Sequence, residues 1–318
     1  METLIPDILH IILKMLSDHG KISLLSITKK YDSFKEYVIY HSKVEFKKIM
    51  GLRYFDNFTN INISWRSYNI CINFFPKNIT HLIFDDDCFG GHHIQKCIPP
   101  TVTHLILDRG FDKYNISIPL NVRHLSIHLV NARKVKGHIP LGVTHLTFAS
   151  IYDTMKECVP SSVTHLTIDN FDTSYYIKDY IPSNVMHLTF NNYDKSIIGC
   201  SSNVTHLTFN SLNASIQNCI PATVTHLTID SVRMRYIKNY IPPTVRHLTF
   251  NRIHYNIKKS IPFGVTHLTI CYTPDYLYLQ DCVPSSVTHL TINHLDLYND
   301  CHFIFNNISS SIECLTFV

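Results

Sequence analysis

The sequence contains few of the residues on which common catalytic and ligand-binding motifs depend. Glycine occurs only 9 times in 318 residues, and none of these glycines belongs to a phosphate-binding loop. The zinc-binding spacings Cys-x-x-Cys and His-Glu-x-x-His do not occur. We therefore expect a protein that is not an enzyme and that holds neither a cofactor nor a metal.

Charged residues are also scarce, at 16% of the chain, and the formal net charge at pH 7 is +4. A nucleic-acid-binding protein normally shows a stripe or patch of Lys and Arg, and no such stripe is present. Within the repeated phrase described below, a basic residue replaces the usual threonine only at Arg123 and Arg246. We expect no nucleic-acid partner.

Long apolar runs are missing too. The longest early one, from Ile8 to Leu16, is interrupted by His10 and Lys14 and fits neither a membrane span nor a signal peptide. Because no secretory signal precedes the 10 cysteines, we expect no disulfide framework. These absences predict a cytoplasmic protein with no membrane contact.

One short phrase, Val-Thr-His-Leu-Thr-Phe or a near variant, dominates the chain. Neighbouring copies are separated by 19 residues at the closest, from His187 to His206, and by 23 at the farthest, from His81 to His104. A further copy has Cys314 in the histidine place. The eleven histidines of the phrase are His81, His104, His124, His145, His165, His187, His206, His226, His247, His267 and His289. A repeat of this length is the signature of a solenoid, in which each unit buries its apolar side against the next.

The copy Val224-Thr-His-Leu-Thr-Ile229 shows how one unit folds. Numbered from Val224, its apolar residues take positions 1, 4 and 6, the spacing of leucine-rich repeats. Alternation along a strand directs Leu227 and Ile229 into the core and His226 outward. The segments between strands are too short and polar for regular α-helices. We predict a right-handed leucine-rich-repeat-like β-solenoid with about twelve parallel strands and non-helical arcs.

Stacked strands place equivalent side chains in columns about 4.8 Å apart. The histidines at position 3 could form a metal array, a proton relay or a recognition strip, but we interpret them as a structural ladder of neutral, stacked imidazoles. A stack of this kind should lower the histidine pKa values, because charging one ring hinders charging the next. Stability should then decrease as the pH falls below about 6.5.

Specificity should reside in the positions that the repeats do not share. The threonine column at position 2 is interrupted at Arg123, Met186 and Arg246, and the column at position 5 at Ile83, Ile106 and Ser126. We predict that Ile83, Ile106, Arg123, Met186 and Arg246 contribute to a partner-binding surface, mainly over the first turns, where the exposed face is more apolar.

The segment before the repeats has a different pattern. Apolar residues from Leu4 to Leu16 recur at helical spacing, and Pro6 suits the start of a helix. We expect a small helical segment over residues 1–45, a connecting segment over 46–76 that caps the first turn, and the repeat solenoid over 77–318. The chain ends on Leu315-Thr-Phe-Val318, a strand with an open edge, which predicts a possible end-to-end dimer.

Two motifs resemble known families. Leu4-Ile-Pro-Asp-Ile-Leu-His-Ile-Ile-Leu-Lys-Met-Leu16, followed by Leu24-Leu-Ser-Ile-Thr-Lys-Lys-Tyr31, resembles an F-box. Val159-Pro-Ser-Ser-Val-Thr-His-Leu-Thr-Ile168 is similar to the FNIP repeat, a relative of the leucine-rich repeat. Proteins that combine the two modules occur in certain protists and large DNA viruses, so the expected location for a viral chain is the host cytoplasm.

The resemblance implies a function. An F-box binds a Skp-type adaptor of a cullin-RING ubiquitin ligase, and the repeat domain presents a protein substrate to it. The adaptor contact would be carried by Leu4, Pro6, Ile8, Leu9, Ile12 and Leu16. The same residues could equally form the core of the helices, in which case the chain would be an interaction scaffold without a ligase link.

Overall fold

The computed structural model describes the N-terminal segment and the strand-forming parts of the repeats. The described residues are 6–64, 75–85, 98–107, 117–130, 135–151, 157–169, 181–193, 203–212, 220–232, 240–253, 260–271, 282–293 and 310–317. The chain forms two compact units, Met1–Ile127 and His128–Val318. The first unit contains the N-terminal helices and the strands up to the start of β5, and the second contains the remaining strands.

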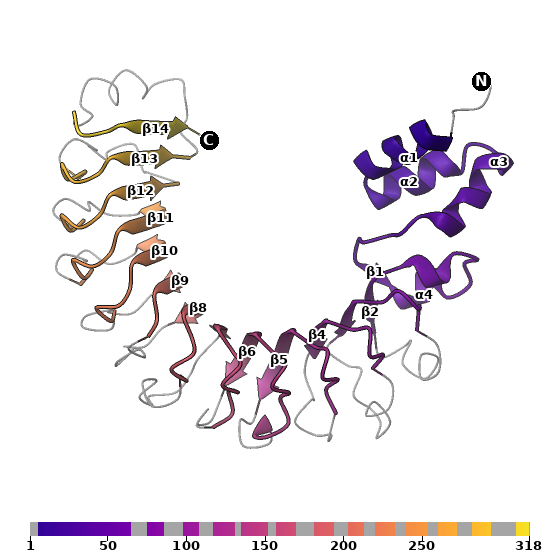
Figure 1. The fold of residues 1–318 in the computed structure, drawn as a ribbon, viewed down its shortest axis with the longest axis horizontal. Helices are drawn as coiled ribbons and strands as arrows, with labels where there is room; N and C mark the ends of the chain where they lie inside the picture. The colour runs from indigo at the N-terminus through magenta and orange to yellow at the C-terminus, as the bar shows by residue number, and fades with distance from the viewer. Residues whose placement is uncertain are drawn as a thin grey trace. The chain divides into compact units, whose positions relative to one another are not determined.

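Short helices make up the N-terminal part of the first unit (Figure 1). They are α1 (Pro6–Met15), α2 (Asp18–Leu25), α3 (Lys29–Asp32), the 3₁₀ helix η1 (Ser33–Tyr37), α4 (Phe46–Ile49) and the 3₁₀ helix η2 (Phe55–Asn57). Side-chain oxygens cap two of them: Ser17 accepts from the backbone N–H of Gly20, and Thr28 accepts from that of Tyr31. The predicted N-terminal helices are thus confirmed, and further short helices follow them beyond residue 45.

The first helices share a small apolar core. Leu9 and Leu13 lie one turn apart on α1, and with Leu25 of α2 they are at most 5% exposed. The partly buried side chains packed against them are those of Leu24, Tyr31, Phe34 and Val38. Because α1 supplies both Leu9 and Leu13 to this core, one side of the helix is already fully used within the chain.

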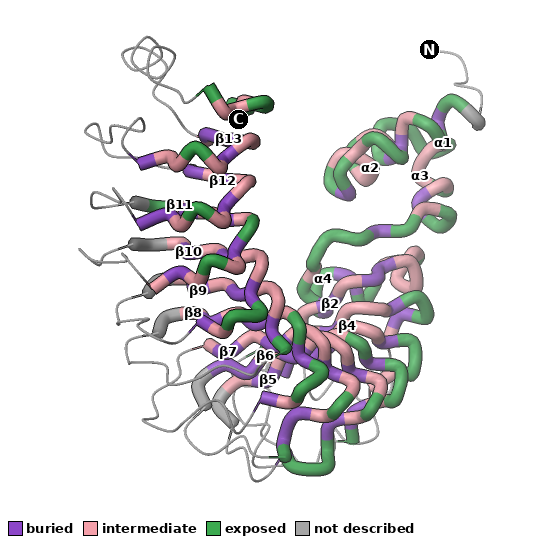
Figure 2. Tube along the Cα trace, turned by 60° about the vertical axis from the view of Figure 1, so that its left-hand side comes forward, coloured by how far each residue is buried: buried purple, intermediate pink, exposed green. Residues whose placement is uncertain are grey.

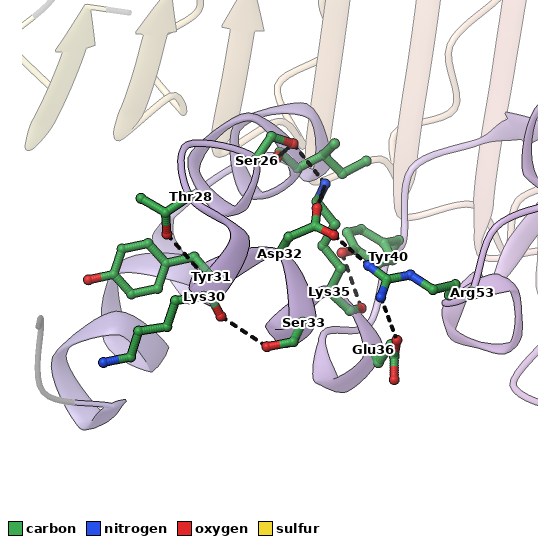
Figure 3. A network of polar contacts seen from close by, with 11 residues as sticks. Ser26, Thr28, Lys30, Tyr31, Asp32, Ser33, Lys35, Glu36, Tyr40 and Arg53 are labelled. Carbon is green, nitrogen blue, oxygen red and sulfur yellow. Dashed lines mark hydrogen bonds and ion pairs between the residues drawn. The ribbon is translucent and has the colours of Figure 1, made fainter.

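Polar contacts join these helices to the residues that follow (Figure 3). The ammonium group of Lys35 is almost entirely buried and donates to Ser26 Oγ at 2.7 Å and to Asp32 Oδ1 at 2.5 Å. Arg53 donates to Asp32 and forms an ion pair with Glu36, with Nη1 and Oε1 3.6 Å apart. A buried ammonium is costly unless it is paired, so this network fixes the end of the helical segment in one arrangement.

Asp18 makes the second link between the helices and the solenoid. Its carboxylate accepts from Lys21 Nζ at 2.7 Å and from the backbone N–H of Ser42 at 2.5 Å. Burial alone would raise the pKa of Asp18, but the hydrogen bonds from Lys21 and Ser42 outweigh it and lower the pKa. The residues that lead into the first strand are therefore held against α2.

Fourteen strands, all in parallel pairs where a pairing is described, follow each other in chain order. They are β1 (Val44–Glu45), β2 (Asn60–Ile63), β3 (His81–Phe84), β4 (His104–Leu107), β5 (His124–Val130), β6 (His145–Ile151), β7 (His165–Asp169), β8 (His187–Tyr193), β9 (His206–Leu212), β10 (His226–Val232), β11 (His247–Ile253), β12 (His267–Ile270), β13 (His289–Ile292) and β14 (Cys314–Phe317). Each strand from β3 to β13 begins at the histidine of the phrase. The predicted parallel solenoid is confirmed, whereas most of the arcs lie outside the described residues.

Equivalent positions of neighbouring repeats are paired without a shift. His226 on β10 lies opposite His247 on β11, and Leu227 lies opposite Leu248. The same pairing of like with like runs through the strands of the second unit from β6 to β14. A slip of one residue would turn every leucine outward, so the apolar alternation sets this register.

The core consists of columns at positions 1, 4 and 6 of the phrase. In the repeat that contains β10, Val224, Leu227 and Ile229 are at most 1% exposed, whereas His226 and Thr228 are half-buried. Figure 2 shows the same succession of buried and partly exposed residues along the other strands. Burial of one such leucine stabilises the fold by about 1.5–3 kcal/mol. Cys158 and Cys282, which precede their strands, are buried alongside these columns.

A tight turn leads into most of the strands from β3 to β13. The N–H of Val224 donates to the carbonyl of Pro221 at 3.1 Å, and the same bond recurs in other repeats. The N–H groups of Thr225 and His226 then both donate to the carbonyl of Thr205 in the preceding repeat, at 2.9 and 3.0 Å. Two donors on one carbonyl fix where each strand starts relative to its neighbour.

The expected number of about twelve strands is wrong by two, because β1 and β2 precede the first recognised phrase. Residues Phe58 to Ile63 read Phe-Thr-Asn-Ile-Asn-Ile, a degenerate copy with apolar residues at positions 1, 4 and 6. Asn60 takes the histidine place, and it pairs with His81. The histidine pattern does not include this copy because Asn replaces His, although its distance of 21 residues from His81 matches the repeat period.

Candidate functional site

The outer face of the sheet carries the side chains of positions 3, 5 and 7. Position 3 holds the imidazoles, position 5 mostly threonine, and position 7 mostly Asn or Asp. All of these side chains are at least partly exposed in the repeat of β9, where they are His206, Thr208 and Asn210. The face is therefore broad and polar, with carboxylates at position 7 in some repeats, and it is the main repeated surface that the described residues present.

The imidazoles of position 3 stack ring on ring within each unit. In the first unit, the ring centroids are 3.9 Å apart between His81 and His104 and 4.1 Å apart between His104 and His124. In the second unit, the separations lie between 4.0 and 4.2 Å from β6 to β13. The rings of this second stack belong to His145, His165, His187, His206, His226, His247, His267 and His289.

The threonine at position 2 orients the ring that follows it. Thr225 Oγ1 lies 2.9 Å from Nδ1 of His226, and the corresponding distance is 3.0 Å between Thr205 and His206. The same contact occurs in the described repeats that have threonine at this position, with distances from 2.8 to 3.0 Å. One nitrogen of each such imidazole is thus engaged by its own repeat, and the rings are held parallel.

The environment of the stack disfavours the charged form of histidine. Burial, together with the neighbouring histidines, lowers the pKa of His206 to about 4. The pKa values of His226, His247 and His267 are lowered for the same two reasons, with burial as the larger cause. The pKa of His81 in the first unit is lowered as well, again mainly by burial. The outer face is therefore uncharged along these rings at neutral pH.

The residues predicted to bind a partner are not gathered at one place. Ile83 and Ile106 lie side by side on β3 and β4, and Ile106 is 41% exposed, so they form a small apolar patch. Met186 is also exposed, but it precedes β8, whereas Arg246 precedes β11. Only the isoleucine pair is brought together by a described strand pairing.

The two arginines at position 2 fold back onto the turns instead of reaching outward. Arg123 Nη1 donates to the carbonyl of Leu120 at 2.9 Å. Arg246 Nη1 donates to the carbonyl of Pro243 at 2.8 Å and to that of Gly264, in the next repeat, at 3.1 Å. Part of their hydrogen-bonding capacity is therefore spent within the solenoid.

Arg246 also takes over a contact that serine or threonine makes elsewhere. The residue before position 1 usually donates to the position 1 carbonyl of the preceding repeat, as Ser286 Oγ does to Val265 at 2.8 Å. Gly264 stands in this place after Arg246, and Arg246 Nη1 instead lies 3.4 Å from the carbonyl of Val245. Arginine at position 2 and glycine before the next position 1 therefore form a matched pair, and the same pair recurs in the sequence as Arg123 and Gly142.

The position 7 column was not anticipated from the sequence. Asn210 Nδ2 donates to Asn191 Oδ1 at 2.7 Å, and Asn293 Nδ2 donates to Cys271 Sγ at 3.4 Å. Asp230 in the same column accepts from Arg252. The signal was available, because Asn or Asp recurs directly after position 6 at the repeat period.

Some of the residues expected to bind an adaptor face the core of the helices, and others are exposed. Leu9 belongs to the core of the helices, Ile12 and Leu16 are half-buried, and Ile8 is 45% exposed. Pro6 begins the helix, while Leu4 lies outside the described residues.

Two residues that the motif did not single out share the outer side with Ile8. Ile11 is 59% exposed and Met15 is 82% exposed, at spacings of three and seven residues from Ile8. This spacing places the three side chains in one row along the helix. The row, here called the α1 apolar row, consists of Ile8, Ile11 and Met15.

The described residues offer no support for metal or membrane chemistry. They contain no group of three or more His, Cys, Asp or Glu side chains that could hold a metal ion. None of the described helices is both long and apolar enough to cross a membrane.

Comparisons with known proteins agree with this architecture. The family model described as FNIP Repeat matches residues 67–109. The FNIP repeat-containing protein L415 of Acanthamoeba polyphaga mimivirus is 28% identical over 166 residues, which cover 48% of this chain and 40% of that protein.

A solved structure has a similar fold. The crystal structure of CroV588, described as a novel circular LRR protein, matches with a TM-score of 0.55 and 22% identity, over 82% of this chain and 40% of that one. The chain thus spans 40% of the length of each of these two proteins. It is a repeat protein with a leucine-rich-repeat-like parallel solenoid, and it contains a segment that matches the FNIP repeat.

Proposed function

We propose that this protein is a non-catalytic substrate receptor of a cullin-RING ubiquitin ligase. The N-terminal helices bind a Skp-type adaptor, and the outer sheet face binds a protein substrate. Neither role requires a cofactor. The proposed site of action is the cytoplasm, and for a viral chain it is the cytoplasm of the host.

The observation that carries the proposal is the α1 apolar row. The opposite side of α1 already packs its leucines into the core of the helices, so Ile8, Ile11 and Met15 are not needed there. Exposed apolar side chains in a row are costly to leave in water and are typical of a helix that binds a partner. The resemblance of this segment to an F-box supports an adaptor as that partner.

Charge on the same segment is consistent with this assignment. Lys14, Lys29 and Lys30 are exposed around the helices. The carboxylates of Asp18 and Asp32 are instead engaged with cations inside the segment. An apolar row on a helix that also carries the exposed Lys14 suits a partner that offers an apolar groove with acidic residues at its edge.

The sheet face supports the substrate-binding half of the proposal. Its strands present aligned polar columns over many repeats, and solenoids use such extended faces to bind other proteins. The apolar pair of Ile83 and Ile106 provides a local departure from the polar columns. Such departures are the places where a partner gains specificity.

An interaction scaffold without a ligase link is the second candidate. The contacts of Asp18 with Ser42 and of Arg53 with Asp32 attach the helices to the start of the solenoid. This attachment is what a purely structural cap needs, because the first repeat of a solenoid requires a cover for its apolar end.

Binding of the full chain to a purified Skp-type adaptor tests the proposal. The unaltered chain should bind, and Ile11→Asp should abolish binding, because it places a charge in the middle of the α1 apolar row. Met50→Asp is the matched control, since Met50 is as exposed as Ile8 but lies outside the row. No binding by the unaltered chain, or equal binding by both variants, would favour the scaffold. Circular dichroism verifies that both variants stay folded.

A further inference from the structure

The imidazole stack of the second unit is continuous over eight strands, β6 to β13. Each ring from His165 to His267 has a ring on both sides, at centroid separations of 4.0 to 4.2 Å. The planes of neighbouring rings are inclined by as little as 5°, between His226 and His247. Neutral imidazoles tolerate this arrangement, whereas two adjacent imidazolium ions would repel each other across it.

Protonation would also break the contact between ring and threonine where the hydroxyl donates to Nδ1. A ring that carries protons on both nitrogens can no longer accept from the hydroxyl of Thr225. That hydroxyl has a second acceptor, the carbonyl of Thr205 in the preceding repeat, at 3.4 Å. In the neutral form of the stack, the rings stack on each other and the threonine hydroxyl can donate to Nδ1. In the charged form, the rings repel each other and the hydroxyl can no longer donate to Nδ1.

Arg246 lies next to the histidine column, since it directly precedes His247 in the chain. Its guanidinium, however, donates to the carbonyls of Pro243 and Gly264 in the turns. Arg252 follows His247 by five residues, about 16 Å along the strand, and is engaged with Asp230. Burial and the neighbouring histidines therefore remain the main causes that disfavour the charged form of His247.

Negative charge is too far away to compensate. Asp169 on β7 and Asp230 on β10 each follow the histidine of their strand by four residues, which corresponds to about 13 Å along a strand. Glu313 lies beside Thr288, at the end of the stack, and Cys314 follows it opposite His289. Among the described residues of the second unit, the acidic groups on the face of the histidine column are Asp169, Asp230 and Glu313. The thiols on that face are those of Cys314 and of Cys271 at position 7.

We infer that the imidazole stack of the second unit is an acid-sensitive latch, which holds β8 to β11 together at neutral pH and loosens them when the pH falls to about 5. The opening is local, because each repeat contacts only its neighbours. The N-terminal helices, which contain no stacked imidazoles, stay closed. The inference does not depend on which partner the outer face binds.

Amide hydrogen exchange of the full chain at pH 7.5 and pH 5.0, corrected for the intrinsic exchange rate, tests the latch. A pKa of about 4 for His206, against about 6.5 when the strand is open, sets an upper limit of about 30-fold on the loss of protection around β9 at pH 5.0. Because His206 is half-exposed and solvent screens its charge, we expect a loss of several-fold in β8 to β11. Protection in α1 and α2 should change by less than about twofold, because Asp18 keeps its charge in this range.

Two variants identify the stack as the source. Asn60 occupies the histidine column beside His81, so asparagine fits this position. His206→Asn should remove most of the pH-dependent loss next to β9, and a chain with asparagine at His187, His206, His226 and His247 should lose nearly all of it. His138→Asn is the control, since His138 is exposed and outside the stack, and it should leave the loss unchanged.

Two outcomes of these exchange experiments would overturn the acid-sensitive latch. Equal protection of β8 to β11 at both pH values would overturn the latch, and so would a full pH-dependent loss that persists in His206→Asn. If the fourfold variant does not fold, the single variant decides the question by itself.

Discussion

Arg246 and Gly264 should behave as one unit when they are mutated. A Cβ atom at Gly264 would lie 2.1 Å from the carbonyl oxygen of Pro243 and 2.5 Å from Nη1 of Arg246. Gly264→Ser alone therefore forces the turn to move against backbone atoms. Overpacking of this kind typically costs about 1–3 kcal/mol of unfolding free energy.

The partner mutation should cost less. Arg246→Thr removes donations to the carbonyls of Pro243 and Gly264, and an exposed arginine contributes about 0.5–1.5 kcal/mol through such bonds. In the double variant, the loss of the Arg246 bridge between the carbonyls of Pro243 and Gly264 lets the Pro243 carbonyl move away from the new Cβ, which restores the arrangement of the other repeats. The serine that replaces Gly264 could then donate to the carbonyl of Val245, as Ser286 does to that of Val265 at 2.8 Å. We expect the double variant to lie within about 0.5 kcal/mol of the unaltered chain, which is a coupling of at least about 1 kcal/mol.

Urea unfolding monitored by circular dichroism measures this cycle, with the slope checked for each variant because a solenoid can unfold in more than one step. Gly51→Ser is the matched control, since a Cβ at Gly51 meets no atom within 4 Å. Additive effects of the two mutations, or a Gly264→Ser variant as stable as Gly51→Ser, would refute the reasoning. Either result would mean that the turn moves freely enough to accept a side chain beside the arginine.

Three further changes test other parts of the structure. Leu9→Ala should destabilise the helical segment by about 2–5 kcal/mol, because it leaves a cavity in the core of the helices. Hydrogen exchange of the α1 and α2 amides measures this loss, and unchanged exchange would contradict the packing of Leu9. Asp18→Asn should lower the free energy of unfolding by about 1–3 kcal/mol at pH 7, because it weakens the contacts to Lys21 and Ser42. In the unaltered chain, the contribution of Asp18 to stability should persist above pH 3.8 and disappear as the pH falls further. Ile106→Thr should leave the melting temperature within about 2 °C while it weakens substrate binding, so that unchanged affinity would remove Ile106 from the partner surface.

The repeated phrase was sufficient to predict the strands from β3 to β14, their parallel pairing and the direction of their side chains. Leu227 and His226 were placed on opposite sides of the sheet by alternation alone, and the structure buries the first and leaves the second half-exposed. This part was predictable because identical units must pack identically. Strand β2 was not predictable from the histidine column, because Asn60 stands in the histidine place.

Other features depend on atoms that periodicity cannot locate. The sequence marks Arg246 as an irregular residue, but only coordinates show that its guanidinium reaches the carbonyls of two repeats. Likewise, helical spacing from Leu4 to Leu16 could not decide which side of α1 faces inward. The answer depends on how α2 packs, and it leaves Ile11 and Met15 outward.

The double hydrogen bond at each strand entry has a consequence for how the chain can vary. Thr225 and His226 both hold one carbonyl of the repeat before them, so the start of a strand is set by its neighbour and not by the length of the preceding arc. Spacings of 19 and 23 residues accordingly produce the same alignment of strands. Insertions, fluorescent labels or foreign epitopes placed in an arc should therefore leave the pairing of the strands on either side intact.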